Sequence, residues 1–291
     1  MILVTGATGQ FGKAAIQAML NKSVPAGSIS ALVRDLTRAT DLKEKGIQLK
    51  TGDYEDLASL FSAFKGVTKL LLVSGNDIPN RARQQRNVVE AAVAAGVTHI
   101  VYTSFLRRNE TTGSPIAAVA ASHIETERII KESGISYTIM RNSLYADVLP
   151  VFMGEKVLET GIYLPAGNGS ASFAARQDMA EAAAEILTGS GHENKDYIIA
   201  NERNYTMYDV AAILSELSGE EIPYTSPATV TYTDTLSKAG IPEEYIQLIA
   251  GFSEAIEQGE FEISHSDLSK LLGRTPTDLK EYLKSVYFPT N

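Results

Sequence analysis

The stretch that decides the fold is residues 4–12, which read Val-Thr-Gly-Ala-Thr-Gly-Gln-Phe-Gly and directly follow an apolar start. This pattern predicts a short buried strand that runs into a glycine-rich turn, with a helix over residues 14–20. In such a turn Gly6 permits the tight bend, Gly9 lets the backbone approach a pyrophosphate, and Gly12 lets the helix pack closely on the strand. The helix N-terminus would point unpaired N–H groups at the phosphates. The stretch therefore predicts a dinucleotide site.

Glycine triplets also mark ordinary turns, so the surrounding pattern decides between the two interpretations. A second strand-like run at residues 28–33 follows at the spacing of a βαβ unit. Further strand-like runs cover residues 47–50, 69–73, 99–103 and 136–140. Helical patterns alternate with these runs at residues 57–64, 82–95 and 118–131, each closed by a glycine, Gly66, Gly96 or Gly134. The alternation predicts an α/β fold with a doubly wound parallel Rossmann sheet.

The second half of the chain lacks this regular alternation and consists of short segments interrupted by glycine and proline. We expect a dinucleotide-binding Rossmann domain over residues 1–143, to which residues 174–200 return as a helix and a strand. Residues 144–173 and 201–291 are expected to form a smaller C-terminal cap or substrate lobe.

Composition excludes several classes of protein. The 291 residues contain no cysteine, which excludes disulfides and Cys-ligated metals, and the four histidines have no HExxH-type spacing, so we expect no metal site. The net charge of −9 argues against nucleic-acid binding. Residues 1–145 nevertheless carry 17 Lys and Arg against 12 Asp and Glu, which suits a phosphate-bearing cofactor or is solvated surface charge. With no apolar stretch long enough for a membrane span and no charged leader, we expect a cytoplasmic protein.

Short motifs lie where the predicted strands end. They are residues 5–12, Val33-Arg34, Gly52-Asp53-Tyr54, Tyr102-Thr103-Ser104 and residues 137–142 leading to Tyr145. Residues 122–127, Ser-His-Ile-Glu-Thr-Glu, add a further motif on a predicted helix. In this combination the chain resembles the NmrA-like members of the atypical, extended short-chain dehydrogenase/reductase superfamily. The resemblance runs nearly end to end and is closest to the bacterial NADPH-dependent quinone oxidoreductases of that group.

The resemblance implies that NADPH is the cofactor, with NADH less favoured. Arg34 stands where NAD-preferring proteins place an acid, and its guanidinium matches the geometry of a ribose 2′-phosphate. Asp35 could instead accept a ribose hydroxyl, and Asp53 could be only a turn former. The full set of expected cofactor-binding residues is Gly6, Thr8, Gly9, Gln10, Phe11, Gly12, Arg34, Asp53, Tyr54, Ser74, Gly75 and Thr103.

The chain departs from the superfamily at its catalytic pair. That pair is a Tyr with a Lys four residues later, where the Lys lowers the pKa of the phenol. None of the 13 tyrosines here has a Lys four positions on. Aligning on Glu127 places Val119 at the Tyr position and His123 at the Lys position, and valine cannot transfer a proton.

Four residues remain as candidates for the catalytic site. His123 would hydrogen-bond the nicotinamide ribose or the substrate, or it is a packed helix histidine. Ser104 stands at the end of a strand, as a site hydroxyl or a cap. Asn142 and Tyr145 could grip a substrate oxygen, although Tyr145 could equally serve packing. For Arg81, on the helix after Ser74-Gly75 with Arg83 and Arg86, a solvated helix face is favoured over steering of the cofactor.

These expectations combine into an NADPH-dependent oxidoreductase that transfers hydride to a quinone or similar flat electrophile. Hydride addition to a quinone gives a delocalised oxyanion that solvent can protonate, so the missing Tyr-Lys pair is tolerated. The alternatives are an NmrA-like NADP-binding redox-sensing regulator with a protein partner and no turnover, and a nucleoside-diphosphate-sugar epimerase-like protein. A homodimer is compatible with each of them.

Overall fold

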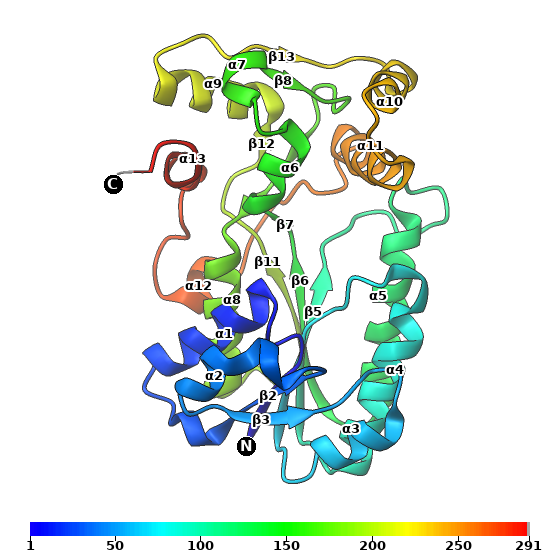
Figure 1. Ribbon diagram of the computed structural model, residues 1–291, viewed down its shortest axis with the longest axis vertical. Coiled ribbons are helices and arrows are strands. Elements are labelled where there is room, and N and C mark those ends of the chain that lie inside the picture. The colour runs from blue at the N-terminus through cyan, green and yellow to red at the C-terminus, as the bar shows by residue number, and fades with distance from the viewer. Residues whose placement is uncertain (290–291) are drawn as a thin grey trace.

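A seven-stranded parallel sheet forms the centre of the computed structural model, which describes residues 1–289 (Figure 1). The strand order is β11-β6-β5-β4-β1-β2-β3. The strands are β1 (Ile2–Val4), β2 (Ile29–Val33), β3 (Gln48–Thr51), β4 (Lys69–Leu72), β5 (His99–Phe105), β6 (Ser136–Asn142) and β11 (Lys195–Ile199). The order reverses at β1, so the predicted doubly wound Rossmann sheet is confirmed.

Helices cover both faces of this sheet. They are α1 (Gln10–Asn21), α2 (Thr40–Glu44), α3 (Leu57–Ala63), α4 (Ile78–Ala94), α5 (Ala117–Glu132) and α8 (Arg176–Thr188), with 3₁₀ turns η1 (Ala26–Ser28) and η2 (Leu36–Ala39). One buried cluster joins α1 and α8 to the sheet, and a second joins α3, α4 and α5 to it. Because both faces are covered, strands such as β4 are apolar almost throughout rather than alternating.

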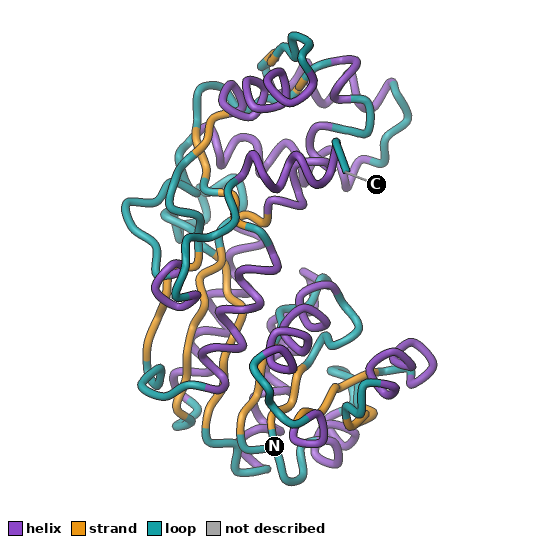
Figure 2. Tube along the Cα trace, turned by 90° about the vertical axis from the view of Figure 1, so that its left-hand side faces the viewer, coloured by secondary structure: helices purple, strands orange, loops and turns teal. Residues whose placement is uncertain are grey.

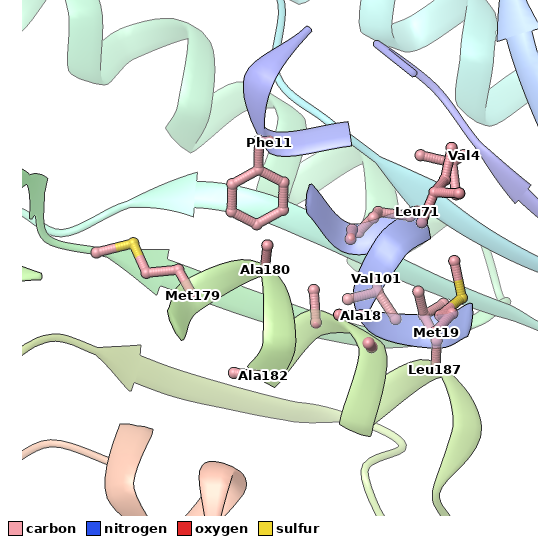
Figure 3. Packing of buried hydrophobic residues seen from close by; sticks show 14 of the residues in the cluster. Val4, Phe11, Ala18, Met19, Leu71, Val101, Met179, Ala180, Ala182 and Leu187 are labelled. Atoms are coloured by element: carbon pink, nitrogen blue, oxygen red, sulfur yellow. The ribbon is translucent and has the colours of Figure 1, made fainter. Parts of the chain in front are cut away.

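Small side chains let α1 and α8 lie close together on one face. In α8, Ala180, Ala182 and Ala183 are fully buried, and in α1 Ala18 is nearly so. Figure 3 shows Ala18, Ala180 and Ala182 with Phe11 against the strands that carry Leu71 and Val101. A compact alanine-rich contact allows the backbones to approach, which places the N-terminus of α8 near that of α1.

The remaining segments form a third hydrophobic cluster at the other end of the molecule (Figure 2). Their strands are β7 (Leu144–Tyr145), β8 (Ile162–Tyr163), β9 (Ser170–Ala171), β10 (Phe173–Ala174), β12 (Tyr205–Thr206) and β13 (Tyr224–Thr225). Their helices are η3 (Ala146–Val148), α6 (Leu149–Met153), α7 (Val157–Thr160), α9 (Met207–Ser218), α10 (Thr229–Lys238), α11 (Glu243–Glu257) and α13 (Leu279–Tyr287).

The helix α12 (Leu268–Leu272) lies within the expected lobe segment 201–291 but packs against α8. Its Leu268 and Leu271 belong to the cluster under α1 and α8. The chain thus returns to the sheet once more than expected, while the exact domain bounds stay a prediction. No helix within residues 1–289 is long and apolar enough to cross a membrane.

Candidate functional site

A pocket of about 560 Å³ lies at the carboxyl ends of the sheet strands, where the strand order reverses. Open α/β sheets bind ligands at this place, and the volume is that of an ordinary ligand site. Its lining comprises Gly6, Thr8, Gly9, Gln10, Phe11, Gly12, Leu32, Val33, Arg34, Arg38, Gly52, Asp53, Tyr54, Val73, Ser74, Gly75, Asn76, Asp77, Gln84, Tyr145 and Arg176. Every expected cofactor-binding residue except Thr103 is in this set.

The glycine-rich turn forms the floor of the pocket between β1 and α1. Gly6 has a φ of +57°, and the Gly9 N–H donates to its carbonyl at 2.9 Å. A Cβ on Gly12 would lie 2.4 Å from the Gly6 oxygen and 2.8 Å from the Ala7 Cα, so only glycine fits there. No side chain caps α1 and its first turn holds no acid, which leaves the helix N-terminus suited to an anion.

Two arginines stand on the β2 side of the turn. Arg34 and Arg38 both line the pocket, and neither side chain has an ion-pair or hydrogen-bond partner that the structure records within residues 1–289. The intervening Asp35 accepts bonds from the Thr37 hydroxyl at 2.7 Å and its N–H at 2.9 Å, which lower the pKa of Asp35. Its carboxylate is therefore engaged with its own turn, whereas both guanidinium groups are available to a phosphate.

Asp53 and Tyr54 lie where β3 ends, beside these arginines. The Asp53 carboxylate accepts the Glu55 N–H at 3.0 Å, so this side chain shapes a turn as well as lining the pocket. Burial raises the pKa of Tyr54 to about 12. Thr103 lies behind the wall, where its hydroxyl accepts the Ser74 N–H at 2.9 Å and so supports the loop after β4.

The β6 side of the pocket is formed by Tyr145 and Arg176. The Arg176 guanidinium lies over the Tyr145 ring, 3.9 Å from its centroid, and forms a two-bond ion pair with Asp147. Burial raises the pKa of Tyr145, an effect that Arg176 partly offsets, so the phenol stays protonated at neutral pH. Asn142 is buried behind Tyr145, with its amide nitrogen 3.5 Å from the phenol oxygen and its Oδ1 without a partner in the described chain.

Three of the expected catalytic residues, Asn142, His123 and Ser104, do not belong to the pocket lining. His123 is buried, its Nδ1 lies 2.8 Å from the Tyr102 hydroxyl, and its ring stacks on Phe105. Burial, with Arg81 and Arg107 nearby, holds the pKa of His123 well below 6.5. This geometry agrees with the packed-histidine interpretation.

Ser104 is likewise engaged inside the fold. Its hydroxyl donates to Glu127, whose carboxylate also accepts from Arg107 at 2.9 Å and Arg141 at 3.1 Å. Burial opposes ionisation of Glu127, but the bonds from Arg107 and Ser104 outweigh it and lower the pKa. The group is an ion network that ties the ends of β5 and β6 to α5.

The basic helix face after Ser74-Gly75 is not uniformly solvated. Arg83 pairs with Glu55 and Arg86 pairs with Glu125 at the surface. Arg81 is instead buried and donates to the Ser122 hydroxyl and the carbonyls of Val119 and Gly75. The expectation of a solvated face is wrong for Arg81. Its guanidinium donates only to uncharged oxygens, and these bonds link α4 to α5 and to the loop after β4.

Sequence reasoning missed several lining residues. Sequence position alone could have suggested three of them. Arg38 follows Arg34 by four residues, and Asn76 and Asp77 directly follow the expected Ser74-Gly75. Arg176 carried no such local signal, because it reaches the pocket only through the packing of α8 on α1. Within residues 1–289 no group of three or more His, Asp or Glu side chains is arranged to hold a metal ion.

Comparisons with known proteins agree on one family. Residues 1–283 match the model of the NmrA-like family. The chain is 37% identical to quinone oxidoreductase 2 of Escherichia coli K12 over the full length of both chains. A solved NADPH-dependent quinone oxidoreductase from Escherichia coli, complexed with NADPH, has a TM-score of 0.90 at 36% identity, covering 99% of this chain and all of that one. Triphenylmethane reductase from Citrobacter sp., complexed with NADP(H), also has a TM-score of 0.90 at 39% identity, covering 98% and 99% of the two chains.

Proposed function

The chain belongs to the NmrA-like family, and from that premise we propose that it is an NADPH-dependent reductase that passes hydride to a quinone or a similar flat acceptor. The observation that carries this proposal is the pocket itself. It joins a phosphate-binding turn to two available arginines on one side and to an aromatic ring with an arginine on the other.

The residues present fit such a cofactor. The open N-terminus of α1 would bind the pyrophosphate, close to Gly9, where a Cβ would crowd the Gly6 carbonyl at 3.2 Å. Arg34 and Arg38 would hold the 2′-phosphate, with Asp53 and Tyr54 beside the adenosine. Ser74 and Gly75 would lie along the cofactor toward Tyr145. When bound, the reduced nicotinamide supplies the hydride.

The proton chemistry of the site favours the acceptor class. Val119 and His123 occupy the positions of the usual proton-transfer pair, and His123 is neutral, buried and bonded to Tyr102. Oxidation of a secondary alcohol needs a base on its hydroxyl, which this pair cannot provide. Reduction of a quinone needs mainly orientation, since solvent can protonate the product. The quinone and the triphenylmethane dye named for the two relatives are both conjugated molecules built from aromatic or quinoid rings.

NADPH consumption with benzoquinone, naphthoquinone and ubiquinone analogues tests the proposal. We expect turnover without added flavin or metal. Tyr145→Phe and Asn142→Ala should reduce turnover more than NADPH affinity, because Tyr145 lines the β6 side of the pocket, where we place the acceptor, and Asn142 lies directly behind it. Tight NADPH binding with flat progress curves for all three acceptors would instead support the redox-sensing regulator. Robust interconversion of UDP-sugars would contradict the argument from Val119 and His123.

A further inference from the structure

Arg176 combines a fixed position with a free donor. Its Nε donates to Asp147 Oδ2 at 2.6 Å and its Nη2 to Oδ1 at 2.8 Å. Its third nitrogen, Nη1, has no hydrogen-bond partner in the described chain, and the side chain is 25% exposed in the pocket wall. Two of the three guanidinium nitrogens therefore anchor the group, and the third remains available to a ligand.

The position of Arg176 is fixed by segments that are distant in sequence. Arg176 begins α8, Asp147 lies in η3, and the Tyr145 ring beneath the guanidinium is 6.3 Å from the ring of Phe11 at the start of α1. A donor held in this way needs little reorganisation when charge develops beside it, which is the condition under which a hydrogen-bond donor speeds a reaction.

Four other arginines in or near the pocket lie on another side of it or are already engaged. Arg34 and Arg38 follow β2, on the far side of β1 from Tyr145. Arg81 bridges α4 and α5, and Arg107 is committed to Glu127. Of the arginines that line the pocket, Arg176 is the one on the β6 side.

We propose that Arg176 stabilises the negative charge that forms on the acceptor during reduction, with Asp147 as its positioning residue; this inference rests on the proposed function. The acceptor gains a hydrogen together with its electron pair as a C–H bond of the reduced cofactor breaks. The cofactor is oxidised and the acceptor is reduced by two electrons. The charge on the acceptor oxygen is held by the Nη1 N–H groups until solvent supplies the proton.

Asp147 also determines how Arg176 would stabilise the charge on the acceptor. Its carboxylate offsets the net charge of the guanidinium, so the contribution comes from directed N–H bonds rather than from an isolated cation. A lysine at position 176 could not bind both carboxylate oxygens and still present a donor in the same direction. Arg176→Lys should therefore recover little of the activity.

The test compares Arg176→Met and Arg176→Ala with the unmodified protein. We expect kcat for quinones to fall about 100-fold or more, the size of effect seen when one such donor is removed, with the NADPH Kd changed less than about twofold. Addition of guanidinium chloride should restore part of the rate to Arg176→Ala, and equal sodium chloride should not. The matched control is Arg274→Met, which removes an arginine that pairs with Asp178 and Glu181 of the same helix outside the pocket and should leave kcat unchanged.

A graded series of quinones adds a second measurement. The loss in Arg176→Met should grow as the hydroquinone product becomes less acidic, because a more localised charge depends more on the donor. If the Arg176 variants fail to fold, Asp147→Asn keeps the arginine but weakens its anchor, and it should raise the acceptor KM and lower kcat without rescue by guanidinium.

The outcomes separate the two proposals. An unmodified protein that reduces no quinone would overturn the proposed function and this inference with it. An active protein whose Arg176 variants keep kcat within about threefold, with no guanidinium rescue and no dependence on product acidity, would overturn the role of Arg176 alone.

Discussion

Arg34 and Arg38 lie four residues apart at the β2 side of the pocket, and both guanidinium groups are available there. NADPH and NADH differ by the 2′-phosphate that such groups recognise. Asp35, the acid that would favour a ribose hydroxyl, is occupied by Thr37. We therefore expect the preference between the two cofactors to depend on a few side chains in one short turn.

Arg34→Ala should weaken NADPH binding about 10- to 100-fold, since a charge-assisted bond contributes about 1.5 to 3 kcal/mol. NADH binding should change little. Fluorescence titration of both reduced cofactors measures this, with Arg108→Ala, an exposed arginine outside the pocket, as the control. Equal dissociation constants for NADPH and NADH in the unmodified protein would reject the assignment of Arg34.

The buried ring of His123 should make the free energy of unfolding depend on pH. Burial lowers its pKa well below 6.5, so the folded protein keeps the ring neutral while the unfolded chain binds a proton below about pH 6.5. The unfolded state then gains protons that the native state does not. The free energy of unfolding should accordingly fall as the pH drops below 6.5.

His123→Asn keeps a polar atom for Tyr102 but removes the titration. Its free energy of unfolding should decline less steeply between pH 6.5 and 5.5, by up to about 1.4 kcal/mol per pH unit. Urea denaturation at several pH values measures the slope, with the exposed His265→Asn as the control. Identical slopes for His123→Asn and the unmodified protein would show that the buried ring is not an acid-sensitive group.

At the scale of elements, two glycines at the junction of β1, the glycine-rich turn and α1 have different roles. Gly12 lies against backbone atoms of Gly6 and Ala7, so a methyl group there must push the helix from the strand. Gly9 has a φ of −81° and ψ of 169°, which any residue adopts, and its Cβ direction meets only the Gly6 carbonyl at 3.2 Å. The fold thus requires Gly12, and we propose that the ligand rather than the fold requires Gly9.

Gly12→Ala should lower the free energy of unfolding by about 1 to 3 kcal/mol, as overpacking does. Gly9→Val should instead abolish NADPH binding while the fold stays largely intact. Denaturation and cofactor titration distinguish the two, with Gly27→Ala as the control because a Cβ there meets nothing within 4 Å. Undiminished NADPH binding by folded Gly9→Val would place the dinucleotide elsewhere.

For the whole molecule, an aromatic contact joins the sheet to the third hydrophobic cluster, the one formed by the C-terminal segments. Phe261 is fully buried, with its ring 5.5 Å from Phe105 at the end of β5 and 6.0 Å from Phe252 of α11. Phe105 is paired in register with Asn142. The orientation of the C-terminal segments relative to the ends of β5 and β6 therefore depends on this contact.

Phe261→Ala should lower the free energy of unfolding by about 3 to 5 kcal/mol, the usual cost of removing a buried phenylalanine ring. It should also raise the acceptor KM more than the NADPH Kd. Phe61→Ala, at a ring that is 38% exposed on α3, is the control and should have a much smaller effect. A loss in Phe261→Ala no larger than that of Phe61→Ala would contradict the role of the aromatic contact.

The sequence by itself determined the sheet and the glycine-rich turn between β1 and α1. Their signals are local: an apolar run predicts a strand covered on both faces, and a glycine is required where φ is positive or where backbones touch. Arg34, Asp53 and Tyr54 could be placed in the pocket for the same reason, since the carboxyl ends of parallel strands meet at one edge.

Only the tertiary structure decided the positions of those side chains whose surroundings come from distant parts of the chain. Whether His123, Ser104 and Arg81 face a ligand or the interior depends on what α4, α5 and β5 bury between them. Arg176 reaches the pocket because α8 packs on α1 and β10 pairs with β7. Such contacts join residues far apart in the chain, and no periodicity within a segment records which distant segment it will meet.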